Sequence, residues 1–278
     1  MNRKRLKQLA KDPGLVPGVY NYCDRWCERC TLAARCLQYR MEEEQRAQEE
    51  AAGLAAAAGD EPDDAKLLAK VQESFELAME MLEESCAEQG IDWEQVKADA
   101  KGAKPGRRKR ERIPPIAGAA MDYARAISTW FEASQPLFRA RGAELSRIAS
   151  MDLPGHDPAA DAAEVNDAMA VLRWYQAQIH VKLMRALTTA QEDDDLIDPE
   201  IAAYDANGST KVALLGIDRS IDAWTRLRRH FPEAEGQILG FLIQLDGLRK
   251  KVEKRFPDAR AFRRPGFDDG TGDAPARA

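Results

Sequence analysis

Residues 165–187 read VNDAMAVLRWYQAQIHVKLMRAL, and the apolar side chains in this stretch return every three or four positions. That spacing matches the α-helical period of about 3.6 residues and places the side chains on one face. Four other stretches repeat the pattern, at residues 68–86, 123–138, 214–228 and 238–256. The alternation typical of a strand is nearly absent, and residues 201–204 are its nearest candidate. The sequence therefore predicts an all-α protein with a C-terminal bundle of about four helices over residues 116–262.

Glycine, proline and serine residues predict where these helices end or come close together. Pro136 removes a backbone donor and should break the helix over residues 123–138. Gly90 is suited to the left-handed cap that ends the helix over residues 68–86. Residues 207–209, Asn-Gly-Ser, predict a turn and a serine N-cap before the next helix. Gly216 and Ser220, four positions apart, leave room for a neighbouring helix to approach closely.

The composition limits the class of protein. The chain has 278 residues, of which 44% are hydrophobic and 32% charged, and no apolar run reaches the roughly 18 to 20 residues that cross a bilayer. Four of the first seven residues are basic, but Lys-Asp-Pro-Gly at residues 11–14 interrupts the apolar core that a signal peptide would need. We therefore expect a cytoplasmic protein without a membrane partner.

The net charge of −6 is unevenly distributed, which predicts five segments. Residues 1–40 are basic and contain four of the five cysteines, and they predict a metal-binding module. Residues 41–100 form a strongly acidic helical segment, and residues 101–115 form a basic linker. The bundle over residues 116–262 follows, and residues 263–278 have almost no core-forming side chains, which predicts a disordered tail.

The four clustered cysteines indicate a bound metal. Cys23, Cys27, Cys30 and Cys36 have the spacing C-x3-C-x2-C-x5-C within fourteen residues. Thiolates so close together repel one another and oxidise readily, and coordination of a cation removes both problems. Zinc and an iron-sulfur cluster both accept four thiolates. The spacing favours a [4Fe-4S] cluster, since structural zinc usually lies between two well-separated cysteine pairs.

This loop resembles the [4Fe-4S] loop of the endonuclease-III-type DNA glycosylases, whose ligands run C-x6-C-x2-C-x5-C. Its last three cysteines are also similar to the end of the cluster motif in the RecB-like iron-sulfur exonucleases. The resemblance implies that Cys23, Cys27, Cys30 and Cys36 bind the cluster. It further implies that loop arginines approach DNA phosphates, a role that Arg25, Arg29 and Arg35 could take. It covers about fourteen residues and carries no catalytic residues, because a helix-hairpin-helix with its lysine and aspartate is absent from the sequence.

Cys23, Cys27 and Cys30 also have the C-x3-C-x2-C spacing of radical SAM enzymes. Those enzymes need a barrel of parallel strands, which this sequence does not predict. Cys86 lies on the apolar stripe of the helix over residues 68–86, so we expect a core thiol there and no fifth ligand.

Three histidines, His156, His180 and His230, are the remaining candidates for acid-base or metal chemistry. None has a glutamate three positions earlier, so the di-iron pattern of helical bundles is missing. We expect His180 to be a hydrogen-bonded core residue and His230 to interact with a helix C-terminus. No catalytic residue is predicted, and an enzyme with a pocket lined by Trp174, Tyr175 and His180 is the least supported alternative.

Three functions remain after these exclusions. The first is a metal-binding helical protein that acts as a binding module for a macromolecule. In its nucleic-acid form, basic blocks at residues 3–11, 25–40 and 101–112 contact phosphates, including Arg107, Arg108, Lys109 and Arg110. The second is an electron-transfer or redox-sensing iron-sulfur protein, in which Trp26, Tyr20 and Tyr22 shield the sulfurs from water. The third is a zinc-binding interaction protein.

Overall fold

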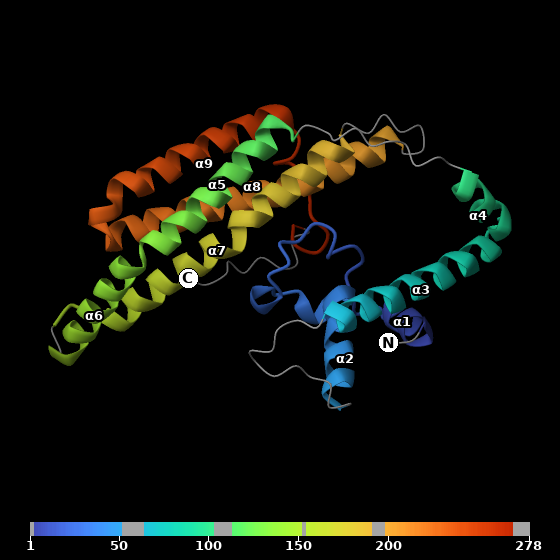
Figure 1. Ribbon diagram of the computed structural model, residues 1–278, viewed down its shortest axis with the longest axis horizontal. Helices are drawn as coiled ribbons and strands as arrows, with labels where there is room; N and C mark the ends of the chain where they lie inside the picture. The colour runs from blue at the N-terminus through green and yellow to red at the C-terminus, as the bar shows by residue number, and fades with distance from the viewer. Residues whose placement is uncertain (1–2, 52–63, 103–112, 152–153, 191–197, 269–278) are drawn as a thin grey trace. The chain divides into compact units, whose positions relative to one another are not determined.

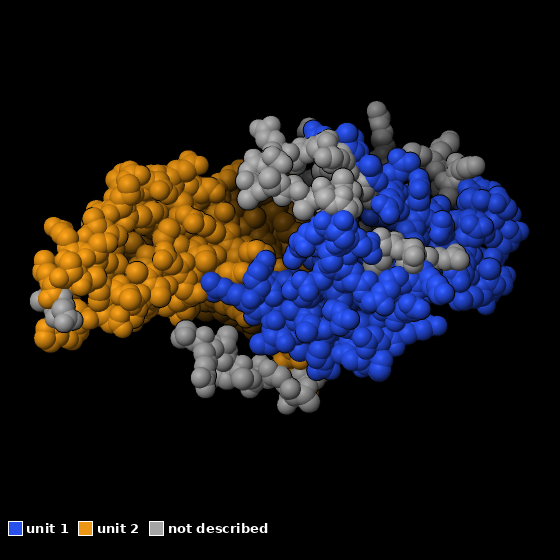
Figure 2. Space-filling view, turned by 90° about the horizontal axis from the view of Figure 1, so that it is seen from below, with its two compact units in different colours: residues 1–20, 27–112 blue, residues 21–26, 113–278 orange. Residues whose placement is uncertain are grey.

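The computed structural model describes residues 3–51, 64–102, 113–151, 154–190 and 198–268 (Figure 1). Within these ranges the chain is helical and has no strand, so the predicted all-α class is confirmed. The described chain divides into two compact units, coloured separately in Figure 2. Residues 1–20 and 27–112 belong to the first unit, and residues 21–26 and 113–278 belong to the second.

The second unit is a bundle of long helices. Its elements are α5 (Pro115–Ala133), α6 (Gln135–Met151), α7 (Pro158–Thr189), α8 (Pro199–His230), the 3-10 turn η3 (Pro232–Ala234) and α9 (Glu235–Arg255). The α7 and α8 helices pack along most of their lengths, and α5 and α9 pack against this pair and against each other (Figure 1). The apolar stripe of residues 165–187 faces this interior: Leu172, Ile179 and Leu183 are almost fully buried.

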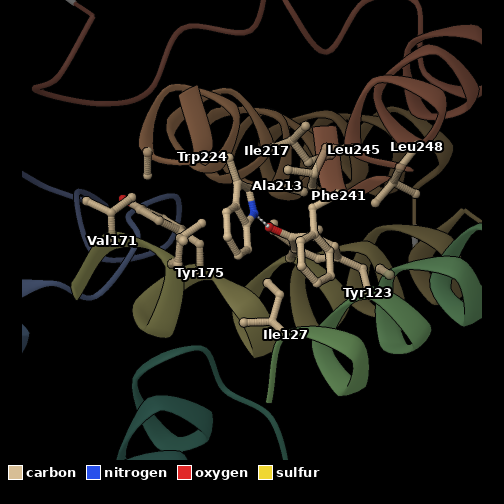
Figure 3. Close-up of a cluster of buried hydrophobic side chains, with 14 of the residues drawn as sticks. Tyr123, Ile127, Val171, Tyr175, Ala213, Ile217, Trp224, Phe241, Leu245 and Leu248 are labelled. Atoms are coloured by element: carbon tan, nitrogen blue, oxygen red, sulfur yellow. Dashed lines mark hydrogen bonds between the residues drawn. The ribbon is translucent and has the colours of Figure 1, made fainter. Parts of the chain in front are cut away.

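An aromatic cluster forms the centre of the bundle (Figure 3). Trp224 of α8 stacks on Phe241 of α9, with ring centroids 4.5 Å apart, and meets Trp130 of α5 edge-to-face. Its indole N–H donates to the Tyr123 hydroxyl at 3.0 Å, so the buried polar atoms of both side chains are paired. Burial raises the pKa of Tyr123 far above its ordinary value, which keeps the phenol neutral in the core.

The close packing of α7 on α8 depends on Gly216. A Cβ atom at this position would lie 2.9 Å from Cδ1 of Tyr175 and 3.2 Å from Cγ1 of Ile179. The absence of a side chain therefore lets the Tyr175 ring lie directly on the α8 backbone, as the sequence predicted for a neighbouring helix. Ser220 donates its hydroxyl to the Gly216 carbonyl at 2.7 Å and needs no partner on α7.

The predicted break at Pro136 is present, because α5 ends at Ala133 and α6 begins at Gln135. Amide groups in the first turn of a helix have no intrahelical acceptor, so proline at position 136 costs α6 no hydrogen bond. The predicted turn at residues 207–209 is wrong, because these residues lie inside α8, as do residues 201–204. The helix starts instead at Pro199, after the N-cap Asp198, whose carboxylate accepts from the Glu200 amide at 2.8 Å. Burial of Gly208, Ser209 and Thr210 overrides their weak helix propensity.

The first unit contains α1 (Arg3–Ala10), the 3-10 turns η1 (Cys27–Arg29) and η2 (Ala33–Arg35), α2 (Leu37–Ala51), α3 (Asp64–Glu88) and α4 (Trp93–Gly102). Gly90, with φ of 70°, ends α3 in a left-handed cap, as predicted. The Ile91 amide donates to the Cys86 carbonyl at 2.8 Å, and the Gly90 amide donates to the Ala87 carbonyl at 3.2 Å. These two bonds are the Schellman pattern.

The apolar stripe of α3 differs from its predicted role. The period over residues 68–86 indicated a helix face that packs in a core, but the larger side chains of this stripe are exposed. The half-buried side chains of α3 include Leu77 and Met81, which lie on another face. Cys86 is also half-buried, so it lies outside the described core.

The linker and tail fall partly outside the described residues. Residues 101–102 end α4 and Pro115 begins α5, and residues 103–112 between them are among those not described. Residues 263–268, predicted to start a disordered tail, instead form a turn closed by an ion pair between Arg264 and Asp268 at 3.0 Å. None of the helices in the described ranges is sufficiently long and apolar to span a bilayer.

Candidate metal centre

The segment from Cys27 to Cys36 is an ordered loop of short turns in the first unit. The Cys30 amide donates to the Cys27 carbonyl at 3.2 Å, and the Cys36 amide donates to the Ala33 carbonyl at 3.1 Å. Cys36 is buried at the start of α2, where its carbonyl accepts from the Arg40 amide at 3.0 Å. Backbone hydrogen bonds therefore order both ends of the short segment that contains these three thiols.

Arg35 closes this loop against the preceding part of the chain. Its carbonyl accepts from the Val16 amide at 2.9 Å, and its Nε donates to the Gly14 carbonyl at 3.2 Å. One guanidinium N–H is thus used inside the first unit. The side chain predicted to contact phosphate therefore also has a structural role.

Cys23 lies in the second unit, on the segment of residues 21–26. Its thiol accepts a hydrogen bond from the backbone N–H of Arg25, a residue with φ of 58°. Burial raises the pKa of the Cys23 thiol, and the Arg25 amide and the nearby Lys182 ammonium oppose that rise. Burial also lowers the pKa of Lys182. A backbone N–H directed at sulfur favours the thiolate, which is the form that binds a metal.

Asp24, next to Cys23, fixes this segment to α7 and α8. Its backbone carbonyl accepts from the indole N–H of Trp174 at 3.0 Å and from the side-chain amide of Gln178. Its carboxylate accepts from Arg219 at 2.6 Å and from the Tyr175 hydroxyl. Partners from two helices, 150 to 195 positions away in sequence, therefore hold the backbone beside the first cysteine.

Aromatic rings flank the same segment. Trp26 stacks on Trp174 with ring centroids 5.0 Å apart, and its backbone N–H donates to the Asp24 carboxylate at 3.2 Å. At the other end, Tyr22 packs edge-on against Phe262 at 4.9 Å and donates its hydroxyl to Asp205 at 3.2 Å. A side chain at Gly208 would collide with the Tyr22 ring, because a Cβ there would lie 2.4 Å from it.

Burial and a neighbouring carboxylate raise the pKa values of Tyr22 and Tyr175. Burial and the Asp205 carboxylate raise the pKa of Tyr22 to about 12. Burial and Asp24 raise the pKa of Tyr175, while Arg219 opposes them. Both phenols therefore remain protonated donors to carboxylates at neutral pH.

The four predicted ligands are described in two separate local settings, Cys23 in one unit and Cys27, Cys30 and Cys36 in the other. Within the described residues, no three His, Cys, Asp or Glu side chains are arranged to hold a metal ion. The donor chemistry of four thiols fits both an iron-sulfur cluster and zinc. Coordination would therefore require the thiols to reorient, since metal binding and local folding are coupled in such loops.

The basic residues predicted to contact nucleic acid lie in different units of the structure, and some of them lie outside the described residues. Arg25 and Arg29 lie among the cysteines, in the second and first unit respectively. In α1, Arg5 donates to Glu44 of α2 at 2.9 Å and Lys7 pairs with Glu84 of α3, so acidic helices offset part of the first basic block. Arg107, Arg108, Lys109 and Arg110 are outside the described residues.

Two of the three histidines form hydrogen bonds within the bundle, and His156 is exposed. His180 is hydrogen-bonded through Nδ1 to the Ala117 carbonyl at 2.8 Å. His230 is the last residue of α8, at the helix C-terminus as predicted, and its Nε2 also lies 2.9 Å from the Glu164 carboxylate of α7. Trp174 and Tyr175 contact the segment of residues 21–26, and they are absent from the lining of a cavity of about 480 Å³ beside α6 and the start of α7.

Sequence reasoning missed the anchoring residues Asp24, Gln178 and Arg219. Asp24 stands between two cysteines, but nothing in the local spacing identifies partners more than 150 positions away. We found no protein-family model, curated protein or solved structure that matches this chain.

Proposed function

We propose that this all-α protein binds one inorganic centre through Cys23, Cys27, Cys30 and Cys36 and acts as a binding module. The observation that carries the proposal is the concentration of four thiols in a fourteen-residue segment that also contains Asp24, the residue bound to α7 and α8. Chain connectivity supports a shared centre, because Cα atoms four residues apart are never separated by more than about 14 Å. The backbone N–H of Arg25 directed at Cys23 supplies the hydrogen bond that a bound thiolate uses.

The proposed centre is a [4Fe-4S] cluster, and a single zinc ion is the alternative. When bound, the cluster would tie the two ends of the loop together, and Trp26 and Trp174 would exclude water near Cys23. The protein's own contribution is positional: Asp24 and its partners hold the segment of the first ligand, and the η1 and η2 turns order the backbone between the other three cysteines.

The test is anaerobic purification of the full chain followed by iron, sulfide and zinc assays. We expect about four iron and four sulfide per chain and a broad absorption near about 400 nm. Cys30→Ser and Cys36→Ser should lose the cluster. Cys86→Ser is the matched control, because Cys86 is a half-buried thiol outside the loop, and it should retain full occupancy.

One zinc per chain, without colour, would replace the cluster by the zinc alternative. Metal-free protein from every preparation, or equal metal content in Cys30→Ser and in the unaltered chain, would refute the proposed centre.

We propose nucleic acid as the macromolecular partner of this module. Arg25 and Arg29 flank the cysteines, and such side chains supply the phosphate contacts that dominate nucleic-acid affinity. Affinity for a DNA or RNA oligonucleotide should fall steeply between low and high salt, and Arg25→Gln with Arg29→Gln should reduce the slope by about two. Binding that is absent, or that is insensitive to salt, would refute nucleic acid as the partner and leave the metal centre to be judged separately.

The electron-transfer alternative has its own support in the stacked rings of Trp26 and Trp174, since Trp26 precedes the ligand Cys27 in the chain. A dry aromatic setting next to a cluster influences its reduction potential. Reversible reduction and reoxidation in a voltammogram would favour this alternative, and a cluster that breaks down on reduction would exclude it.

A further inference from the structure

The residue that follows Cys23 contacts the middle of α7. The Asp24 carbonyl accepts from the indole N–H of Trp174 at 3.0 Å and from the side-chain amide of Gln178. Trp174 and Gln178 are four positions apart, so they lie one turn apart on the same face of the helix. The segment that contains Cys23 therefore meets α7 along this face.

The residue that precedes Cys23 is held further along the same helix. Tyr22 donates its hydroxyl to Asp205 of α8 at 3.2 Å, and Nε of Arg185 in α7 donates to the same carboxylate at 3.1 Å. Arg185 comes seven positions after Gln178, which is about two turns of helix. Cys23 therefore lies beside the part of α7 between Gln178 and Arg185.

Lys182 occupies that part of α7. It comes four positions after Gln178 and three before Arg185, a spacing that places all three residues on one face. The Lys182 side chain is half-buried. Burial raises the pKa of the Cys23 thiol and lowers the pKa of Lys182, and each of these two groups opposes the shift of the other. The ammonium and the sulfur thus lie within range of each other's charge.

The other opposite charges on this side of the bundle are already matched. Arg219 pairs with Asp24 at 2.6 Å, and Arg185 pairs with Asp205. Within the residues that the structure describes, no carboxylate forms an ion pair with Lys182. A cation that is partly withdrawn from water without a counter-charge is unfavourable. The surroundings of Lys182 therefore favour an additional negative charge beside Cys23.

We propose that the Lys182 ammonium supplies the counter-charge for an anionic metal centre held at Cys23. This inference rests on the centre proposed above. Four thiolates around a [4Fe-4S] cluster or a zinc ion give a group with net negative charge. A reduced cluster carries one more negative charge than the oxidised form, so a neighbouring ammonium stabilises the reduced form more and raises the reduction potential.

A redox titration of the anaerobically purified full chain, followed by electron paramagnetic resonance, tests this role. Lys182→Met removes the charge and keeps a side chain of similar length. We expect about a tenfold change in the reduction equilibrium, which lowers the potential of a one-electron couple by about 59 mV. At an effective dielectric constant of about 20, a unit charge up to about 10 Å away is sufficient for this effect.

Two further variants separate the charge of Lys182 from other effects of the substitution. Lys182→Arg keeps the positive charge and should retain most of the potential. Lys251→Met is the matched control, because it removes the same charge from an exposed lysine of α9, where water and salt screen it. Its potential should equal that of the unaltered chain. Circular dichroism and iron and sulfide assays show whether each variant keeps its helices and its centre.

The outcomes distinguish this inference from the proposed centre itself. An unchanged potential in Lys182→Met, or an equal fall in Lys251→Met, would overturn the inference and leave the centre in place. Loss of the centre in Lys182→Met with retention in Lys182→Arg would support the role of the charge, and loss in both would overturn it. Protein that never contains metal would overturn the centre and this inference together.

A zinc-containing protein calls for a different measurement of the same charge. The dissociation constant for zinc, measured by competition with a chelator, then replaces the potential. We expect Lys182→Met to weaken zinc binding about tenfold and Lys251→Met to leave it unchanged. Equal affinity of Lys182→Met and the unaltered chain would overturn the inference.

Discussion

The Asp24 carboxylate and the Arg219 guanidinium form an ion pair at 2.6 Å although they are 195 positions apart in the chain. Tyr175 joins both groups, because its hydroxyl donates to the same carboxylate and lies next to the same guanidinium. This contact connects the segment that bears the first cysteine to α7 and α8. It is one of the contacts that join residues 21–26 to the C-terminal unit.

Removal of the Asp24 carboxylate should loosen this segment. Asp24→Ala leaves the Tyr175 hydroxyl and Arg219 without that acceptor, and we expect the free energy of unfolding to fall by about 1 to 3 kcal/mol. Because Arg219 is half exposed, the ion pair itself contributes only a small part of this value. Urea denaturation followed by tryptophan fluorescence measures the change. Asp122→Ala, at an exposed carboxylate of α5, should alter stability by less than about 0.5 kcal/mol. Equal stability of the two variants would contradict the anchoring role.

A methyl group at position 216 should force α7 and α8 apart. Gly216→Ala places a carbon 2.9 Å from the Tyr175 ring, and overpacking of this kind costs about 1 to 3 kcal/mol. Alanine also favours a helix over glycine by about 1 kcal/mol, which offsets part of the cost. Gly240→Ala on α9 is the control, because no atom lies within 4 Å of its added Cβ, and it should stabilise the protein. Thermal unfolding of both variants gives the comparison, and an increase in melting temperature for Gly216→Ala would show that the helices can adjust.

Alkaline pH should destabilise the second unit through Tyr22. The pKa of Tyr22 rises to about 12 in the folded protein, above the ordinary value of about 10 for an unfolded chain. The folded state thus holds its proton more tightly, so this contribution to stability is complete below pH 10 and disappears as the pH rises to about 12. Denaturation at pH 9 and pH 11 measures the loss. Tyr22→Phe should reduce the pH dependence over this interval, and an unchanged dependence would show that other groups cause it.

Metal removal should release the cysteine loop without unfolding the bundle. If the proposed centre binds, chelation should increase amide hydrogen exchange over residues 27–36, because coordination contributes to the folding of that loop. Exchange in the part of α8 around the buried Trp224 should remain slow. Hydrogen exchange with mass spectrometry reads both regions in one experiment. Protection of the loop that is identical before and after chelation would show that its own turns are sufficient to order it.

Most of the helical pattern could be predicted from local sequence. The stripe over residues 165–187 indicated α7 and its buried face, Pro136 indicated the break between α5 and α6, and Gly90 indicated the end of α3. Each of these features depends on residues within one or two helical turns. Residues 207–209 misled the prediction because their preference for a turn is local, whereas burial against Tyr22 and the bundle keeps them helical.

The four candidate metal ligands can be named from the sequence, but their arrangement cannot. Four cysteines at short intervals suffice to propose a centre, because donor type and spacing are properties of the sequence. The contacts of Asp24 could not be predicted from the sequence, since Asp24 meets Trp174, Tyr175 and Arg219 only after α7 and α8 have packed together.

The order of apolar and polar residues determined by itself that this chain is helical and which face of each helix is apolar, because those properties follow from a period of three to four residues. Only tertiary structure decided what each face meets. The stripe of α7 is buried by α8, while the equally regular stripe of α3 remains exposed in its unit. The physical reason is that an apolar face is stabilised when it is buried, whereas the surface that buries it depends on packing between residues far apart in the chain.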